Sequence, residues 1–315
     1  MRLAVDVSVV IPTVNRLAFL RQAIRSALEQ SRSPREVVVS DNSGDPHYAL
    51  AIETLVRDFR DPVLRVVHQP KRLSMVEHCN VLIDLASSEY WLYLPDDDWL
   101  EATCLERMAG ALQAHPSASF AFSDHWLADA LANRRHAETT ANSHEYGRDS
   151  LAPGLVTHEA LLELAVRQCF ELQSMLFRRT LISALRFDPA YDSLPDYDLQ
   201  IRAALSPLTG DAVYVKERLT TYRLHAEQFT SSFQARRFNQ QLATLMERVG
   251  PRSGATEQMR RRRLARANRA LALCASEAGE RRVALMHLRQ ALRTEPTTRW
   301  TTLSYAPLVV APRWT

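Results

Sequence analysis

The sequence is poor in glycine and lacks the glycine-rich motifs that cradle phosphates. Only 8 of its 315 residues are glycine, and neither G-x-G-x-x-G nor G-x-x-x-x-G-K-[ST] occurs. A Rossmann dinucleotide-binding fold and a P-loop therefore have no support. The four cysteines are scattered without a C-x-x-C pair, so neither a disulfide framework nor a zinc site is indicated.

Long apolar runs are also missing. No stretch approaches the 18 or more uncharged apolar residues that a membrane-spanning helix needs. A strand-like run begins at Val7, which predicts that no signal peptide precedes the fold, and a reduced cytoplasmic compartment is expected. With 46% hydrophobic and 24% charged residues, the composition is that of a globular protein, and the length predicts about two domains.

Acidic residues are scarce in the C-terminal quarter. Residues 233–315 hold 16 arginines or lysines against 5 acids, a net charge of +11, while residues 1–232 hold 23 against 31, or −8. Such asymmetry indicates two functional parts, of which the basic one faces a polyanion or an anionic membrane surface. The alternative is a set of solvated, arginine-rich helices.

Strand-like and helix-like segments alternate along residues 7–94. β-branched apolar runs predict strands, and the first of them should end at Pro12, which cannot continue a central strand. Alternation at this spacing predicts βαβ units and a mostly parallel sheet, whose ligands bind beyond the carboxyl ends of the strands. The expected strands are 7–11, 36–40, 64–68, 90–94, 119–123, 173–178 and 212–215; the expected helices are 16–30, 49–59, 76–86, 102–114, 161–166, 180–185 and 197–204.

Two further regions have patterns of their own. Residues 128–155 are polar and predict a long loop, which is uncommon unless it is functional or mobile. From Phe233 onward the pattern is only helical, and segments 264–278 and 281–292 predict an αα-hairpin that turns at Gly279. One such hairpin cannot bury its apolar face alone, so it should pack on the preceding domain or on another subunit.

The acidic run Asp96-Asp97-Asp98 directly follows an apolar strand. Three adjacent carboxylates repel one another, so a cation or hydrogen-bond donors must compensate them. Hard oxygen ligands suit Mg²⁺ or Mn²⁺, which could neutralise a diphosphate leaving group. The alternative is an exposed acidic turn in which Asp98 caps a helix beginning at Trp99.

Six blocks of the sequence, taken in order, resemble family 2 glycosyltransferases with the GT-A fold. They are V-S-V-V-I-P-T-V-N-R (7–16), E-V-V-V-S-D-N-S (36–43), S-S-E-Y-W-L-Y-L-P-D-D-D-W-L (87–100), S-M-L-F-R-R (174–179), P-D-Y-D-L-Q-I-R-A (195–203) and Y-R-L-H-A-E-Q-F-T (222–230). The resemblance implies an α/β GT-A catalytic domain over residues 1–232, followed by a basic helical region with an αα-hairpin over residues 233–315.

The resemblance also implies a nucleotide-diphospho-sugar donor. Pro12, Thr13 and Asn15 match the first donor-binding loop, and Asp41 matches the carboxylate that binds the nucleobase. An acceptor-only carboxylate suits the imide N–H of uracil or thymine, which favours a UDP- or dTDP-linked donor. The alternative for Asp41 is that it caps the turn that follows it.

Other positively charged and acidic residues match the diphosphate and metal sites. Lys71 and Arg72 precede a helix and could reach the diphosphate, or form a surface turn, while His78 and Asn80 on that helix are expected only to fix the loop. The acidic run resembles the D-x-D element, in which one aspartate binds the ribose and another the metal. Pro95 stands where relatives carry an Asp, so the principal ligand of Mn²⁺ or Mg²⁺ is either Asp97 or Asp98. Asp96 and Asp97 are expected to bind the donor.

Two later blocks complete the expected site. Asp196 matches the catalytic base of inverting members, although Pro195 replaces their usual Glu, and Asp198 is expected to cap the helix. His225 matches a histidine that reaches the diphosphate or the metal. Gln228 and Thr230 are expected to close over the donor as a lid.

The hypothesis is an inverting, metal-dependent glycosyltransferase that acts on a hydroxyl acceptor of a polysaccharide, glycolipid or secondary metabolite. The alternatives are an inactive GT-A binding or scaffold protein and a sugar nucleotidyltransferase, although the first loop lacks the glycine-rich basic signature of that class. No nucleic-acid partner is expected. Arginines 260–263 and the aromatic and apolar residues 300–310 suggest peripheral contact with the inner face of an anionic membrane. The competing expectation is that the C-terminal helices pack on the catalytic domain or form a homodimer.

Overall fold

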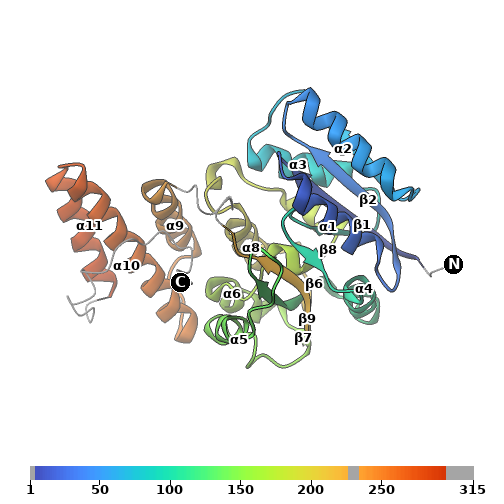
Figure 1. The fold of residues 1–315 in the computed structure, drawn as a ribbon. Helices are drawn as coiled ribbons and strands as arrows, with labels where there is room; N and C mark the ends of the chain where they lie inside the picture. Colours follow the sequence, from blue (N-terminus) through green and yellow to red (C-terminus); the bar gives the residue numbers. More distant parts are fainter. Residues whose placement is uncertain (1–3, 226–233, 296–315) are drawn as a thin grey trace.

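The computed structural model describes residues 4–225 and 234–295 (Figure 1). A nine-stranded sheet has the order β3-β2-β1-β4-β8-β6-β9-β5, with β7 paired to β9. The strands are β1 (Ala4–Thr13), β2 (Ser33–Asp41), β3 (Leu64–His68), β4 (Tyr90–Tyr93), β5 (Trp99–Leu100), β6 (Ala118–Ala128), β7 (Gly154–Val156), β8 (Met175–Arg178) and β9 (Asp211–Arg223). The lid residues Gln228 and Thr230 and the C-terminal residues 300–310 lie outside the described residues.

The first half of the sheet has the predicted βαβ organisation. Strands β1 to β4 are parallel, and the intervening helices are α1 (Leu17–Leu28), α2 (Pro46–Phe59) and α3 (Met75–Leu85). Helix α3 begins with a capping box in which Ser74 and Glu77 each satisfy a backbone N–H of the other. This half therefore confirms the strand and helix predictions, with boundaries that move by a few residues.

The expectation that Pro12 ends the first strand was wrong, because β1 continues to Thr13. The amide of Leu94 donates to the carbonyl of Val10, whereas the amide of Asn42 donates to that of Thr13. Alternate residues of β1 thus face β4 and β2, and Pro12 faces the β4 side. Strand β4 pairs only with Val7–Val10 of β1. No β4 residue therefore lies opposite Pro12, and the backbone N–H that proline lacks is not needed for sheet pairing there.

The second half of the sheet is mixed rather than parallel. Strand β8 lies antiparallel to both β4 and β6, and β6 is parallel to β9. Both β6 and β9 are longer than predicted, because their second halves carry polar residues and register shifts around Asp124 that hide the strand pattern. The remaining helices of this part are α4 (Cys104–Ala114), α5 (His136–Glu145), α6 (His158–Arg167), α7 (Arg179–Leu185) and α8 (Pro195–Leu205), with short 3₁₀ turns η1 (Leu172–Ser174) and η2 (Pro189–Tyr191).

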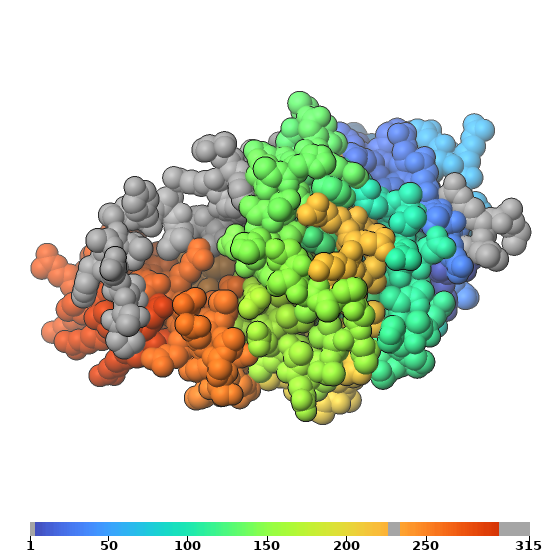
Figure 2. Space-filling model, turned by 90° about the horizontal axis from the view of Figure 1, so that it is seen from below, coloured from blue at the N-terminus to red at the C-terminus, as the bar shows by residue number. Residues whose placement is uncertain are grey.

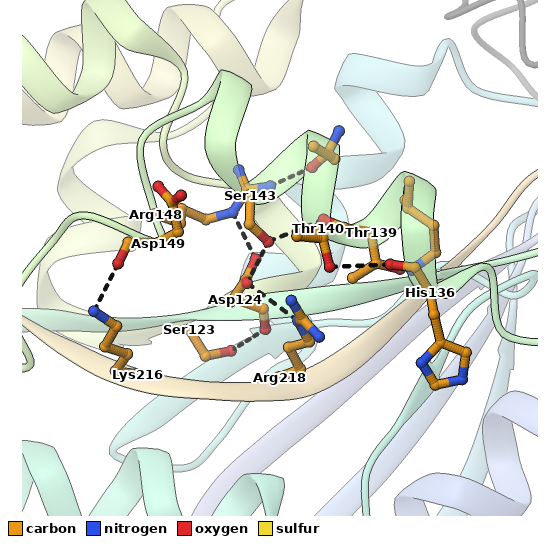
Figure 3. A network of polar contacts seen from close by, with 12 residues as sticks. Ser123, Asp124, His136, Thr139, Thr140, Ser143, Arg148, Asp149, Lys216 and Arg218 are labelled. Carbon is orange, nitrogen blue, oxygen red and sulfur yellow. Dashed lines mark hydrogen bonds and ion pairs between the residues drawn. The ribbon is translucent and has the colours of Figure 1, made fainter.

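The predicted loop over residues 128–155 was also wrong, because it contains helix α5 and the start of β7. The buried face of α5 is polar, so the sequence lacks the periodic apolar residues that would predict a helix here. Instead, Ser143 Oγ donates to Asp124 Oδ2 at 2.6 Å (Figure 3). Thr139 Oγ1 accepts from the backbone N–H of Leu127. Arg148 Nε donates to Asp124 Oδ1 at 2.7 Å, which ties the segment after the helix to β6.

Two apolar cores lie on opposite faces of the sheet. Alternate residues of β1 enter each: Val9 packs with α1, α2 and α4, whereas Val10 packs with α3, α6, α7 and α8. All four cysteines are free, as the sequence indicates. The second of these cores extends into the C-terminal helices through Leu242, Leu245, Met246, Leu264 and Leu271.

The C-terminal helices are α9 (Ala235–Val249), α10 (Gly254–Glu277) and α11 (Arg281–Thr294). Helices α10 and α11 form the predicted hairpin, with Gly279 in the left-handed region (φ 75°) at the turn. Helices α9 and α10 share the core of the catalytic part, whereas α11 packs on α10 at the end of the molecule opposite β1–β3 (Figures 1 and 2). Over residues 4–225 and 234–295, no helix has both the length and the apolarity needed to cross a bilayer.

Candidate active site

The polar ends of β1, β4 and β9 meet at one edge of the sheet. Thr13 Oγ1, at the end of β1, donates to Asp96 Oδ2 at 2.7 Å. His225, which follows β9, places Nε2 3.0 Å from Asp97 Oδ2. The fold therefore brings together residues more than 200 positions apart, as the sheet pattern and the resemblance predict.

Every carboxylate of the acidic run has at least one compensating contact, and Asp96 and Asp97 share Arg16. Arg16 Nη1 lies 2.7 Å from Asp97 Oδ2 and 3.3 Å from Asp96 Oδ1. Asp98 Oδ1 accepts from the backbone N–H of Arg223 at 2.8 Å, while its buried Oδ2 has no hydrogen-bond partner among the described residues. The predicted need for compensation is thus met by an arginine and by hydrogen-bond donors.

The alternative in which Asp98 caps a helix from Trp99 was wrong. Trp99–Leu100 forms β5, paired with Thr220 and Thr221 of β9, and the next helix begins only at Cys104. The carboxylate of Asp98 instead fixes the start of the segment that leads from β9 to His225.

The acidic run remains electrostatically unfavourable despite these contacts. Burial, together with the charge of Asp97, raises the pKa of Asp96 to about 7, although Thr13 and Arg16 oppose the shift. Burial and Asp97 also raise the pKa of Asp98 well above its ordinary value. Additional positive charge at this edge would therefore stabilise the ionised carboxylates.

Arg223 holds the acidic segment in place, a role that the sequence did not reveal. Its side chain is buried, donates from Nε to the carbonyl of Asp97 at 2.8 Å, and donates from Nη1 to the carbonyl of Ala130 at 3.0 Å. The guanidinium lies between the rings of Phe19 and Trp99, 4.7 Å and 4.8 Å from their centroids. The only feature of the sequence that could have indicated this role is the position of Arg223, two residues before His225.

Asp41 ends β2 and is almost fully buried. Its Oδ1 accepts from the backbone N–H of Ser43 at 2.8 Å, and its Oδ2 lies 2.9 Å from Nδ1 of His68. The first contact is the turn-capping bond of the alternative interpretation. Because each carboxylate oxygen can accept more than one hydrogen bond, these contacts leave acceptor capacity for a ligand N–H.

The loop after β1, which contains Asn15, and the loop that carries Lys71 and Arg72 lie beside these strand ends. Asn15 has φ 57°, a left-handed conformation that asparagine tolerates better than most residues. Asn42 bonds both the N–H and the carbonyl of Leu73, which fastens the loop carrying Lys71 and Arg72 next to the end of β2. Both cations are exposed.

His78 and Asn80 on α3 have structural contacts, as expected. His78 Nε2 lies 2.8 Å from Ser40 Oγ, and burial lowers the pKa of His78 to about 4. Asn80 bonds the backbone N–H and carbonyl of Phe187, which fixes the segment leading to α8. Together they fix the positions of the end of β2 and of the segment leading to α8 relative to α3.

Asp196 lies in the first turn of α8 and is partly exposed. Burial raises its pKa, while backbone N–H groups of the helix start, including that of Tyr197, oppose the shift. Asp198 does not cap the helix as expected. It is fully buried and accepts from Arg202 Nε at 2.6 Å, one turn along α8.

Glu171 is a further acidic residue that the sequence did not single out. Burial raises its pKa to about 7; Arg148 opposes this shift and the charge of Asp196 adds to it. The Tyr93 phenol and the Cys79 thiol share a hydrogen bond; the charges of Asp96 and Asp97 act on Tyr93, and that of Asp196 acts on Cys79. The acidic run and Asp196 therefore both act electrostatically on this pair.

Comparison with known proteins assigns this arrangement. Residues 8–159 match the family described as Glycosyl transferase family 2, a stretch that runs from within β1 through β7 and includes the acidic run. The chain carries a family 2 glycosyltransferase domain. The resemblance of the first blocks is therefore confirmed, while the individual residue assignments remain predictions.

Two curated proteins match part of the chain. A GalNAc(5)-diNAcBac-PP-undecaprenol beta-1,3-glucosyltransferase of Campylobacter jejuni is 30% identical over 105 residues, which are 33% of this chain and 31% of that protein. The uncharacterized protein y4gI of Sinorhizobium fredii is 30% identical over 120 residues, or 38% and 13% of the two chains. The chain thus matches about a third or less of the length of these relatives.

Solved glycosyltransferase structures share the fold. S. aureus TarS 1-349, in complex with UDP-GlcNAc, superposes with a TM-score of 0.59 at 16% identity, covering 85% of this chain and 71% of that one. The mannosyltransferase PcManGT of Pyrobaculum calidifontis, in complex with GDP-Man and Mn²⁺, gives 0.57 at 17% identity, covering 95% and 83%. The predicted GT-A fold with a C-terminal helical extension is confirmed.

Proposed function

We propose that the protein is an inverting, metal-dependent glycosyltransferase that moves a sugar from a nucleotide-diphospho-sugar to an acceptor hydroxyl. The observation that carries the proposal is that Thr13, the acidic run and His225 meet at one sheet edge. The charges of this edge and of Asp196 act on the same Tyr93–Cys79 pair. The ligands named for the two solved neighbours, UDP-GlcNAc and GDP-Man, support a donor of this class.

The donor would bind along the ends of β1 and β2. Pro12, Thr13 and Asn15 would line the nucleotide, and Asp41 would accept the imide N–H of uracil or thymine with its remaining lone pairs. Lys71 and Arg72, held beside β2 through Asn42, would meet the diphosphate as exposed cations. Asp96 and Asp97 would contact the ribose side of the donor. A UDP- or dTDP-sugar is therefore favoured.

The residues of the acidic edge fit a hard divalent cation, Mn²⁺ or Mg²⁺. The buried Oδ2 of Asp98 has no hydrogen-bond partner among the described residues, and carboxylate oxygens with an imidazole are donors that Mn²⁺ accepts. Across residues 4–225 and 234–295, no three such side chains are already arranged around one point. Asp97 or Asp98, with His225, would hold the ion, which supplies charge neutralisation for the departing diphosphate.

Arg16 would have to yield part of its contact with Asp97 when such an ion binds. The guanidinium now compensates the carboxylate that the ion would share. Its reach to both Asp96 and Asp97 places it where it could turn to the negative diphosphate instead. Arg16 is thus a counter-ion of the donor-free site.

Asp196 would act as the base. It would take the proton of the acceptor hydroxyl while that oxygen attacks the anomeric carbon opposite the diphosphate. A pKa raised by burial brings a carboxylate closer to the range in which a general base is effective. The acceptor belongs to a polysaccharide, a glycolipid or a secondary metabolite.

We also propose that residues 1–232 are the catalytic domain and residues 233–315 a basic helical region in the cytoplasm. Because α9 and α10 complete one apolar core, removing them should destabilise the catalytic domain as well. The competing proposal is that the C-terminal helices also form a homodimer, instead of packing only on the catalytic domain of the same chain.

Thermal shift with a panel of UDP-, dTDP- and GDP-sugars, with and without Mn²⁺, tests the donor proposal. A donor at about 100 times its Kd should stabilise the protein by ~2.7 kcal/mol. Binding that needs Mn²⁺, followed by nucleoside diphosphate release, supports transfer. Stabilisation without any turnover would favour an inactive binding protein, and formation of nucleotide-sugar from a sugar phosphate would identify a nucleotidyltransferase.

A further inference from the structure

The outer face of α11 is basic, apolar and free of acidic residues. Arg282, Arg289 and Arg293 are spaced so that they line up along one face of the helix, and all three are exposed. Leu285 and Met286 lie beside this line, with 52% and 57% of their surfaces exposed. We call this set of five residues the α11 face.

Nothing in the described part of the chain neutralises the α11 face. The two glutamates that flank the helix are already engaged: Glu280 pairs with Arg236, and Glu295 pairs with Arg262 and Arg269. The three arginines of the face form no ion pair with any acid in residues 4–225 or 234–295. Residues 234–295 contain 14 arginines against 5 glutamates.

The opposite side of α11 has the contacts that hold the helix in place. Ala291 is buried, and His287 Nδ1 lies 2.9 Å from Asn268 Oδ1 on α10. Arg261 of α10 donates to the carbonyl of Thr294 at 2.6 Å. The α11 face therefore lies on the side of α11 turned away from α10, and α11 itself is at the outer end of the molecule (Figure 1).

We propose that the α11 face binds the surface of an anionic lipid bilayer. A guanidinium can pair with a lipid phosphate, and apolar side chains beside the arginines can enter the boundary between headgroups and acyl chains. Each basic residue close to an anionic membrane surface strengthens binding severalfold. The face thus combines the two components of interfacial binding.

Two other partners fit the α11 face less well. A symmetric dimer through it would place identical arginine lines against each other, and like charges in an interface are unfavourable. A nucleic acid would satisfy the arginines but would leave Leu285 and Met286 exposed beside a hydrophilic backbone. The combination of charge and exposed apolar surface favours the bilayer.

Co-sedimentation of the full chain with vesicles tests the proposal. Vesicles of phosphatidylcholine with about one third phosphatidylglycerol should bind the protein, and pure phosphatidylcholine should not. Replacing the three arginines by glutamine (R282Q/R289Q/R293Q) should weaken binding on the order of 100-fold. L285S/M286S should reduce the binding that persists at high salt, where charge is screened.

A matched control removes the same charge elsewhere. R25Q/R35Q/R57Q changes three exposed arginines of the glycosyltransferase domain and should leave vesicle binding within about twofold of wild type. Circular dichroism and donor-induced thermal shift establish that every variant is folded. Equal binding of wild type and R282Q/R289Q/R293Q would overturn the proposal. Absence of vesicle binding by wild type would also overturn it if wild type instead formed a dimer in light scattering, or bound duplex DNA tightly, and R282Q/R289Q/R293Q abolished that association.

Discussion

Replacing Arg148 by methionine should destabilise the protein more than most single substitutions would. Its side chain is fully buried and donates to Asp124 (Figure 3). It also donates to the side chain of Asn142 and to the carbonyl of Cys169. Methionine fills a similar volume but carries no charge. The carboxylate of Asp124, whose side chain is only 10% exposed, would then lose its closest cation.

The expected cost follows from this burial. Removing one partner of a buried ion pair costs about 3–5 kcal/mol, because the other charge stays uncompensated. Ser143 and Arg218 still reach Asp124, at 2.6 Å and 3.4 Å, so we expect the lower end, about 3 kcal/mol. For a domain of this size that corresponds to a melting temperature lower by roughly 6–12 °C.

The double variant R148M/D124N is the internal control. It removes both charges, so it should be clearly more stable than R148M alone. Burial raises the pKa of Asp124, but Arg148 and the bond from Ser143 outweigh it, and the pKa is lowered overall. The stabilisation is therefore present above pH ~4, the ordinary range of an aspartate, and is lost as the pH falls below it.

Thermal melts of the three proteins at pH 7 and at pH 3.5 measure both effects. The wild type should lose much of its advantage over R148M at the lower pH. An R148M melt within 2 °C of wild type at pH 7, or a double variant no more stable than R148M, would refute the explanation through an uncompensated carboxylate.

Two further variants probe the site. R16M removes the counter-ion of Asp97 and should tighten Mn²⁺ binding by the donor-free protein by roughly 10-fold. Electron paramagnetic resonance of free Mn²⁺ measures this binding. Unchanged or weaker binding would show that Arg16 does not compete with the ion. D41N should weaken UDP binding by roughly 10-fold or more in calorimetry, because the amide replaces a charged acceptor, and an unchanged Kd would remove Asp41 from the nucleobase site.

The sequence predicted the first half of the fold well because its elements follow simple patterns. Strands β1 to β4 are apolar and β-branched, and the intervening helices have clear apolar faces. Helix α5 was missed because its buried face consists of Thr139, Asn142 and Ser143, whose partners lie on β6 and in the segment that follows α5. The stability of α5 depends on hydrogen bonds to residues outside the helix, and a periodic pattern of apolar residues in the sequence cannot indicate such bonds.

The same distinction applies to the site. Thr13, Asp96 and His225 could be expected together because each follows or ends a strand at the same sheet edge. Arg16 and Arg223 were not assigned, because their side-chain contacts join residues at least 80 positions apart and depend on the path of each loop. Local sequence identifies which residues reach the edge, and tertiary packing decides which of them compensate one another.

Nucleoside diphosphate release from the donor that binds best, compared between wild type and D196N, tests the proposed function most directly. With Mn²⁺ and an acceptor hydroxyl present, wild type should turn over, and D196N should bind the donor equally well while transfer falls by at least ~10²-fold. D58N, a change at an exposed acid on α2, should behave as wild type. Transfer by D196N at the wild-type rate would contradict Asp196 as the base, and no turnover of any nucleotide-sugar by wild type would contradict the glycosyltransferase itself.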